Sequence, residues 1–194
     1  MPRIQRDSLM TLETYAKTRK EYRARVIPHK KVRTVHLGEH ITLMFEDELT
    51  MRYQIQEMLL SEKAFEEEAI RDELEVYNPL VPDGSNWKAT MLLEYEDIDA
   101  RRRALMQLKG IEDRVWVWVE GCAKVWAIAD EDLPRENEVK TSAVHFLRFE
   151  LEPAMVTALK RGAPLAVGVD HPAYHAEISL TDAATRDALV ADLA

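Results

Sequence analysis

The stretch VRTVHLGEHITLMF, residues 32–45, decides the fold class, because it predicts two short β-strands separated by a tight turn. Residues 32–37 and 41–45 are rich in apolar and β-branched side chains, and Gly38 supplies the backbone freedom that a tight hairpin needs. Helix signals lie on both sides of this hairpin. The sequence therefore predicts an α+β fold with mostly antiparallel sheets, a long central helix and flanking helices.

The helices on either side of the hairpin are predicted from caps and apolar spacing. Before the hairpin, residues 7–25 are expected to form a helix that starts with the capping residues aspartate and serine, and Pro28 lies beyond its predicted end. After the hairpin, apolar residues recur at three- and four-residue spacing from residue 48 to residue 77, which predicts one long helix. A kink near Ser61 is the alternative.

Charge is divided unevenly along the chain. Residues 1–33 carry ten Lys/Arg and three acids, a net charge of +7, whereas residues 34–194 carry sixteen and thirty-two, a net charge of −16. Within the second part, residues 46–75 hold eleven acids and three bases, a net charge of −8. This division predicts that the basic N-terminal helix docks on the acidic long helix, and an external acidic partner is the alternative.

The C-terminal part, residues 87–194, is predicted to be rich in strands. A loop at residues 78–86, which contains two prolines and a glycine, separates it from residues 1–77 within one compact domain of residues 1–194. The predicted strands cover residues 87–95, 115–119, 122–129, 143–151, 165–169 and 174–180, of which the second and third form a hairpin. The predicted helices cover residues 98–108, 153–161 and 182–193.

Composition and motifs argue against several classes of protein. The net charge of −9 disfavours nonspecific binding to nucleic acid or anionic membranes. Cys122 is the single cysteine, so we expect no disulfide framework, no zinc ribbon and no iron–sulfur cluster. The N-terminus MPRIQRDSLM has no apolar leader and no segment approaches the ~20 apolar residues that span a bilayer, so a cytoplasmic protein is expected. The common phosphate-binding, dinucleotide-binding, hydrolase and metalloprotease motifs are absent from the sequence.

The first candidate for chemistry is His145 in SAVHFLRF. Strand alternation places His145 on the face shared with Ala143, Leu147 and Phe149, which is expected to point inward, and places Arg148 on the other face. A buried imidazole can bind a metal or transfer protons, and a core histidine bonded to backbone or carboxylate is the more frequent case. Arg148 is a candidate for holding an anionic substrate.

The second candidate is the polar cluster DHPAYH, residues 170–175. Asp170, His171 and His175 could supply ligands to zinc or iron. Strand alternation after the proline places His175 on the solvent face, and turn chemistry explains the aspartate and proline without a metal. His171 with His145 is the better pair for a site, provided that the fold brings them together.

Polar side chains at the start of the long helix form a third candidate. Arg52 and Gln56 are four residues apart and share a helix face, with Tyr53 beside them, so they could bind a carboxylate or a partner protein. The alternative is structural anchoring of the preceding hairpin. The three tryptophans within residues 115–129 either line a pocket or, as the strand pattern favours, fill the core.

Three blocks of the sequence resemble a known family. MRYQIQEML at residues 51–59, SAVHFLRF at 142–149 and DHPAYH at 170–175 look like the recurring blocks of a bacterial family called domain of unknown function 3501. The resemblance covers nearly the whole chain and implies a single-domain family. It also implies gene neighbourhoods that encode rubrerythrin-like proteins and iron–sulfur oxidoreductases of the heterodisulfide-reductase type, and hence peroxide or electron-transfer physiology. It supplies no catalytic residues.

Three functional hypotheses follow. The first is an accessory or partner-binding protein of bacterial redox metabolism, whose partners are iron–sulfur oxidoreductases or rubrerythrin-like proteins. The second is a metal-dependent or acid–base enzyme that uses His145 and His171, with Arg52 or Arg148 holding an anionic substrate. The third, nucleic-acid binding, needs a free basic helix and is disfavoured by the predicted internal pairing. It would use Arg19, Lys20, Arg23, Arg25, Lys30, Lys31 and Arg33.

Overall fold

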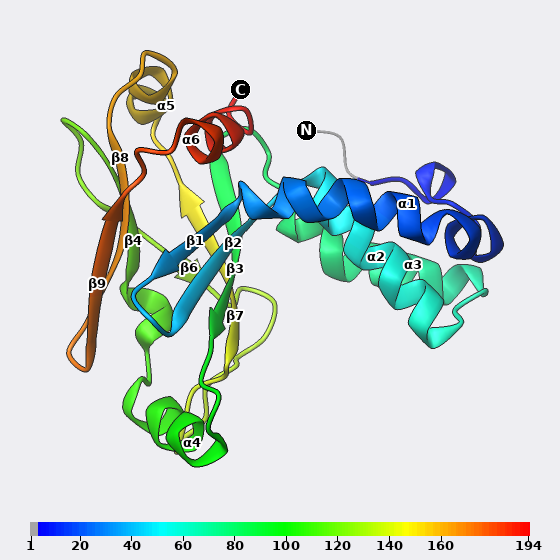
Figure 1. The fold of residues 1–194 in the computed structure, drawn as a ribbon, viewed down its shortest axis with the longest axis horizontal. Coiled ribbons are helices and arrows are strands. Elements are labelled where there is room, and N and C mark those ends of the chain that lie inside the picture. The colour runs from blue at the N-terminus through cyan, green and yellow to red at the C-terminus, as the bar shows by residue number, and fades with distance from the viewer. Residues whose placement is uncertain (1–3) are drawn as a thin grey trace.

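The computed structural model describes residues 4–194, which form two antiparallel β-sheets with a helical arm on one side (Figure 1). Residues 1–3, the start of the N-terminal segment MPRIQRDSLM, lie outside the described residues. The first sheet contains, in spatial order, β1 (Thr34–Leu37), β2 (Ile41–Glu46), β3 (Asn86–Leu93), β7 (Val144–Glu150) and β6 (Ile128–Ala129). The second contains β5 (Val125–Trp126), β4 (Val115–Val119), β8 (Leu165–His171) and β9 (Tyr174–Ser179). The predicted α+β fold with mostly antiparallel sheets is confirmed.

The helices occupy three places around the sheets (Figure 1). The arm consists of α1 (Leu12–Lys31), α2 (Glu48–Glu62) and α3 (Glu67–Tyr77). One end of the sheets carries α4 (Ile98–Gln107), and the opposite end carries α5 (Pro153–Lys160) and α6 (Ala183–Val190). Short 3-10 helices cover Arg6–Ser8, Asn78–Leu80 and Ile111–Arg114. Among residues 4–194, no helix combines the length and apolar character needed to cross a membrane.

The two sheets share one hydrophobic core. Val115 and Val117 of β4 lie in the same buried cluster as Trp87 of β3 and Phe149 of β7. The Trp87 indole also donates a hydrogen bond of 2.8 Å to the Leu189 carbonyl, which ties the first sheet to α6. Burial of these large side chains is the main force that holds the sheets together, at about 1.5–3 kcal/mol for each fully buried apolar side chain.

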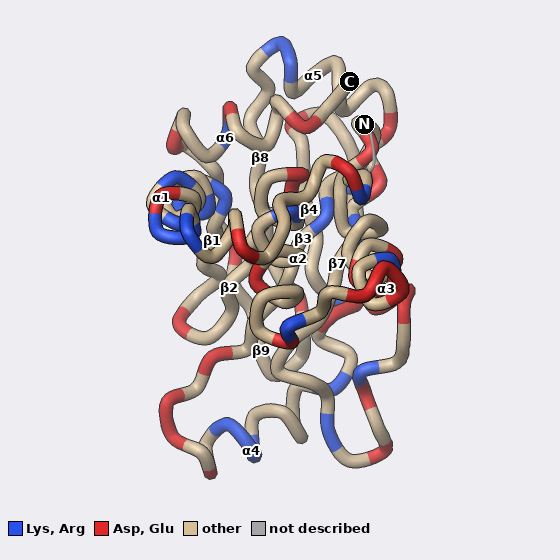
Figure 2. The backbone as a smooth tube through the Cα atoms, turned by 90° about the vertical axis from the view of Figure 1, so that its right-hand side faces the viewer, with Lys and Arg blue, Asp and Glu red and all other residues tan. Residues whose placement is uncertain are grey.

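The arm contains two smaller buried clusters of its own, one between α2 and α3 and one between α1 and α2. Their central members are Met51, Ile55, Leu59, Ile70 and Leu74 in the first, and Tyr15, Tyr22 and Val26 in the second. The predicted docking of the basic helix on the acidic segment is present: Arg19 donates to both carboxylate oxygens of Glu57 at 2.8 and 2.7 Å. Figure 2 shows basic residues concentrated on α1 and acidic residues on α3. The arm therefore exposes charges of opposite sign on two of its helices.

Arg33 fastens the base of the arm to the sheets and to the C-terminal end of the chain. It is buried, and its guanidinium donates to the carbonyls of Phe45, Glu46 and Ala188 at 2.8, 3.1 and 3.2 Å. It also forms an ion pair with the Asp192 carboxylate. Arg33 is thus an internal anchor and not part of a free basic surface.

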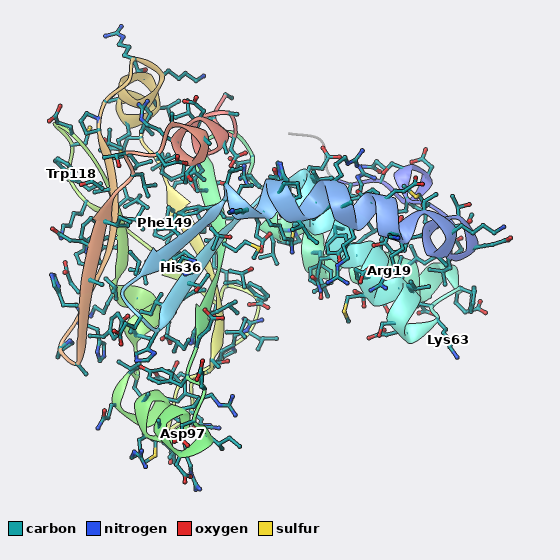
Figure 3. All side chains as sticks on the ribbon, viewed as in Figure 1. Arg19, His36, Lys63, Asp97, Trp118 and Phe149 are labelled. Carbon is teal, nitrogen blue, oxygen red and sulfur yellow. The ribbon has the colours of Figure 1, made fainter. Side chains whose placement is uncertain are left out.

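The predicted long helix from residue 48 to residue 77 is wrong in detail, because it is divided into α2 and α3. Lys63 adopts a left-handed conformation with φ of 52° and donates its backbone N–H to the carbonyls of Leu59 and Leu60, which ends α2. The chain then reverses, and α3 packs back on α2 through their shared apolar cluster. Lys63 lies at the far end of the arm, as Figure 3 shows. The kink expected near Ser61 is therefore a full break two residues later.

The N-terminal helix also differs from the prediction. Thr11 caps α1 by accepting a hydrogen bond from the Thr14 backbone, and Ser8 belongs to the preceding 3-10 turn. The helix continues through Pro28 to Lys31 instead of ending before the proline. Burial of one face of α1 against α2 compensates for the hydrogen bond that proline removes.

The predicted hairpin of residues 115–119 and 122–129 is shared between the two sheets. Val125 and Trp126 pair with β4, whereas Ile128 and Ala129 pair with β7 in the first sheet. The chain thus crosses from one sheet to the other at Ala127. Trp126 is exposed, so it does not fill the core as the strand pattern suggested.

Candidate functional site

His145 lies at the centre of a buried polar cluster, and its predicted inward orientation is confirmed. Its Nδ1 lies 2.6 Å from the Asp130 carboxylate. Its Nε2 lies 2.9 Å from the Thr141 hydroxyl and 3.1 Å from the Ser142 carbonyl. Both ring nitrogens therefore have partners inside the protein.

The carboxylates of this cluster are held in different ways. Asp130 has a left-handed backbone with φ of 49° and accepts hydrogen bonds from the Phe146 backbone at 3.0 Å and from Arg135 at 3.2 Å. Glu112 lies on the other side of the ring, with its carboxylate 3.8 Å from Nε2 of His145. Burial raises the pKa of Glu112 because the charged form is separated from water.

Glu112, Asp130 and His145 are close enough to be considered as metal ligands, since their ligand atoms lie within 4.8 Å of one another. Asp130 approaches Nδ1, however, while Glu112 is on the side of Nε2, and the two ring nitrogens point in different directions. The Thr141 hydroxyl occupies the space between Nε2 and Glu112, at 2.9 and 3.3 Å. This closed network favours a structural role, in which the cluster fastens residues 130–141 to the first sheet.

His171 and its neighbours lie in a different setting. Nε2 of His171 lies 3.0 Å from the Lys109 carbonyl, so the contacts of His171 differ from those of His145. Asp170 forms ion pairs with Lys124 at 2.9 Å and with His175 at 2.8 Å. The hydrogen bond from Lys124 lowers the pKa of Asp170. Asp170 and His171 belong to β8, so the turn between β8 and β9 contains only Pro172 and Ala173 and is shorter than predicted.

Arg52, Gln56 and Tyr53 serve the arm itself. Arg52 donates to the carbonyl and hydroxyl of Ser8 at 2.8 and 2.7 Å, and Gln56 is buried and bonds both backbone groups of Met10. The ring of Tyr53 stacks on the ring of Tyr22, with 6.2 Å between their centroids. These side chains hold the N-terminal segment on α2, whereas the structural alternative expected from sequence was anchoring of the hairpin.

Arg148 lies on the face of the first sheet next to α3. A second basic residue on this face, Lys88, was not predicted as a site residue from the sequence. Arg148 donates to Glu131 at 2.8 Å and to Glu150 at 2.6 Å. Lys88 on β3 is directly opposite Arg148 in the strand register. The only sequence signal for Lys88 was its place on the polar face of the alternating strand NWKATMLL, and its pairing with β7 could not be inferred locally.

A groove lies at the other end of the first sheet, between α4 and residues 137–140. It has a volume of about 800 Å³ and includes the exposed apolar side chains Ile98, Met106 and Val139. Arg101 and Arg102 also line it. Within residues 4–194, the guanidinium groups of these two arginines form neither a hydrogen bond nor an ion pair.

Comparisons with known proteins identify the family. A solved structure described as a novel protein of unknown function from Burkholderia pseudomallei K96243 is 56% identical, with a TM-score of 0.94 and full coverage of both chains. The search of curated proteins finds no match. The family model described as "Protein of unknown function (DUF3501)" matches residues 3–193. The chain therefore belongs to the DUF3501 family, as the resemblance of its three sequence blocks predicted.

Proposed function

We propose that this protein is an accessory, partner-binding protein of bacterial redox metabolism, and that it docks its partner in the groove beside α4. The observation that carries the proposal is the clustering of exposed apolar side chains next to arginines without internal partners. Ile98, Val139 and Met106 are 70%, 63% and 48% exposed. Exposed apolar side chains gathered in one concave surface are characteristic of binding sites.

The residue types around the groove match those of protein interfaces. Methionine and arginine are enriched at such interfaces, and an apolar centre with a polar rim excludes water from the contact. Three basic residues, Arg101, Arg102 and Lys140, line the groove with one acidic residue, Glu138, so its rim carries a net positive charge. Charge complementarity therefore calls for a partner surface that combines acidic and apolar side chains.

The redox part of the proposal rests on the family resemblance. The gene neighbourhoods that it implies point to iron–sulfur oxidoreductases or rubrerythrin-like proteins as partners. An accessory role agrees with a chain that has one cysteine and so cannot build a four-cysteine cluster alone. The role of the groove is then to bring such a partner into a larger assembly.

Affinity capture from a native host under anaerobic, low-salt conditions tests this proposal. We expect the wild-type protein to recover an iron–sulfur or rubrerythrin-like protein, and the double variant Ile98→Asp with Met106→Asp to lose it. Ile27→Asp is the control, because Ile27 is 56% exposed and belongs to α1, which lies away from α4 (Figure 1). Recovery of no such protein, or equal recovery with the groove variant, would contradict the proposal.

A further inference from the structure

Lys88 lies where two cavities meet. One cavity, of about 470 Å³, lies beside residues 78–86, and the other, of about 400 Å³, lies beside the end of α3. Lys88 lines both of them, as do Pro79, Glu131 and Arg148. Its position in the middle of β3 fixes the start of its side chain within the first sheet.

Lys88 is half-buried, and within residues 4–194 its ammonium group has neither a hydrogen-bond nor an ion-pair partner. Removal of a charged amine from water without compensation is unfavourable, so buried lysines usually have partners. The neighbouring Arg148 instead directs its guanidinium to Glu131 and Glu150. These two carboxylates are therefore occupied by another cation.

The surroundings of Lys88 shift its protonation equilibrium toward the neutral amine. Burial lowers the pKa of Lys88, and the nearby charge of Arg148 lowers it further. Glu131, Asp83 and Glu150 act in the opposite direction, and burial outweighs them. A neutral amine is a nucleophile, and desolvated lysines of this kind form Schiff bases with carbonyl compounds.

The cavity beside α3 has a mostly apolar wall. Its apolar lining includes Val76, Leu80, Leu133 and Phe146, and its charged lining consists of Glu75, Lys88, Glu131, Asp132 and Arg148. A volume of about 400 Å³ is within the range of small-molecule sites. This arrangement fits a molecule with a short aliphatic chain and one polar, reactive end.

We propose that Lys88 is a reactive lysine that captures small aliphatic aldehydes as Schiff bases, with the aliphatic chain in the apolar cavity beside α3. The lone pair of Nζ attacks the carbonyl carbon, and the carbonyl oxygen takes up a proton to give a carbinolamine. The hydroxyl group then leaves as water while nitrogen loses a proton, and a C=N bond forms. No oxidant or reductant is consumed in this step. The site is separate from the groove beside α4.

Reductive trapping tests the proposal. The intact protein is treated with a limiting amount of hexanal and sodium cyanoborohydride, and the alkylated lysines are mapped by peptide mass spectrometry. We expect Lys88 to be labelled several-fold faster at neutral pH than the exposed Lys20 and Lys63, because more of its amine is neutral. Labelling of Lys88 no faster than of these two controls would overturn the proposal.

A second variant tests the apolar cavity separately. Leu133→Asn, which adds a polar side chain without a charge, is expected to lower the labelling of Lys88 by hexanal several-fold and to leave its labelling by formaldehyde unchanged, since formaldehyde has no aliphatic chain. Circular dichroism of the variant checks that it is folded. Equal hexanal labelling in the folded variant and the wild type would contradict the place assigned to the aliphatic chain.

Discussion

At the scale of single residues, the structure separates side chains that serve the fold from those left available for binding. His145, Gln56 and Arg33 were candidates for function in the sequence. Each is buried, and its side-chain polar atoms bond other parts of the chain. The side chains of Lys88 and Arg101 carry no such bonds within the described part of the chain, and the sequence did not single these residues out. Polar residues that look conspicuous in a sequence are thus often the ones that the fold already uses.

The structural role of His145 predicts a large effect on stability. His145→Ala leaves Asp130 and Thr141 without their partner in a buried setting, and we expect a loss of about 2–4 kcal/mol in the free energy of unfolding. Urea denaturation measures it. His175→Ala is the matched control, because His175 is exposed and should change stability by no more than about 0.5 kcal/mol.

Metal addition provides the opposing test for the same cluster. If the hydrogen-bonded cluster around His145 is structural and binds no metal, addition of zinc or manganese leaves the melting temperature of the wild-type protein unchanged. A rise in melting temperature on metal addition that is lost in His145→Ala would instead assign Glu112, Asp130 and His145 to a metal site.

At the scale of elements, local signals identified most segments, and non-local pairing produced the errors. Helix α5 begins at a proline and ends before a glycine, and both marks were visible in the sequence. The break after α2 was missed because a lysine, and not a glycine, adopts the left-handed conformation there. The division of residues 122–129 between two sheets was also missed, since neighbouring strands with the same pattern give no local sign of which sheet they join.

The break between α2 and α3 predicts a stabilising substitution. Lys63→Gly removes the steric cost of a left-handed side-chain residue, and we expect the free energy of unfolding to rise by about 0.5–1 kcal/mol. Ser61→Gly, two residues earlier and inside α2, should lower it by a similar amount. If Lys63→Gly destabilises the protein as Ser61→Gly does, the assigned helix end is incorrect.

The contact between α1 and α2 predicts a pH-dependent contribution to stability. Hydrogen bonds from Arg19 hold the pKa of Glu57 below its usual value, with a further contribution from Tyr15. A carboxyl group with a lower pKa in the folded state stabilises the fold above its unfolded pKa of about 4.3, and this contribution is lost as the pH falls through the folded value. Figure 3 shows Arg19 in the arm, where this pair joins the two helices.

We therefore expect Glu57→Gln to cost about 0.5–2 kcal/mol at pH 7 and clearly less near pH 3, as measured by urea denaturation at each pH. Glu68→Gln is the control, because Glu68 is exposed and its nearest cation, Arg71, is 3.9 Å away. A difference between wild type and Glu57→Gln that is independent of pH would show that charge is not the cause.

At the scale of the whole molecule, Arg33 connects the arm to the sheets and to the C-terminal end of the chain. Its guanidinium binds backbone carbonyls of β2 and α6 and the carboxylate near the C-terminus. We expect Arg33→Met to lower the free energy of unfolding by about 3–5 kcal/mol, since it leaves Asp192 buried without its cation. Denaturation followed by tryptophan fluorescence measures this loss. The exposed Arg161→Met should be nearly neutral, and equal effects of both variants would exclude the anchoring role.

Site-specific photo-cross-linking in a native host tests whether the groove beside α4 is the docking site that we propose for a redox partner. A photoreactive amino acid is placed at position 106 in the groove and, as the control, at position 27 on α1. We expect a cross-link from position 106 to an iron–sulfur or rubrerythrin-like protein and none to that protein from position 27. Cross-links to it from position 27 alone, or none from position 106, would exclude the groove as the docking site.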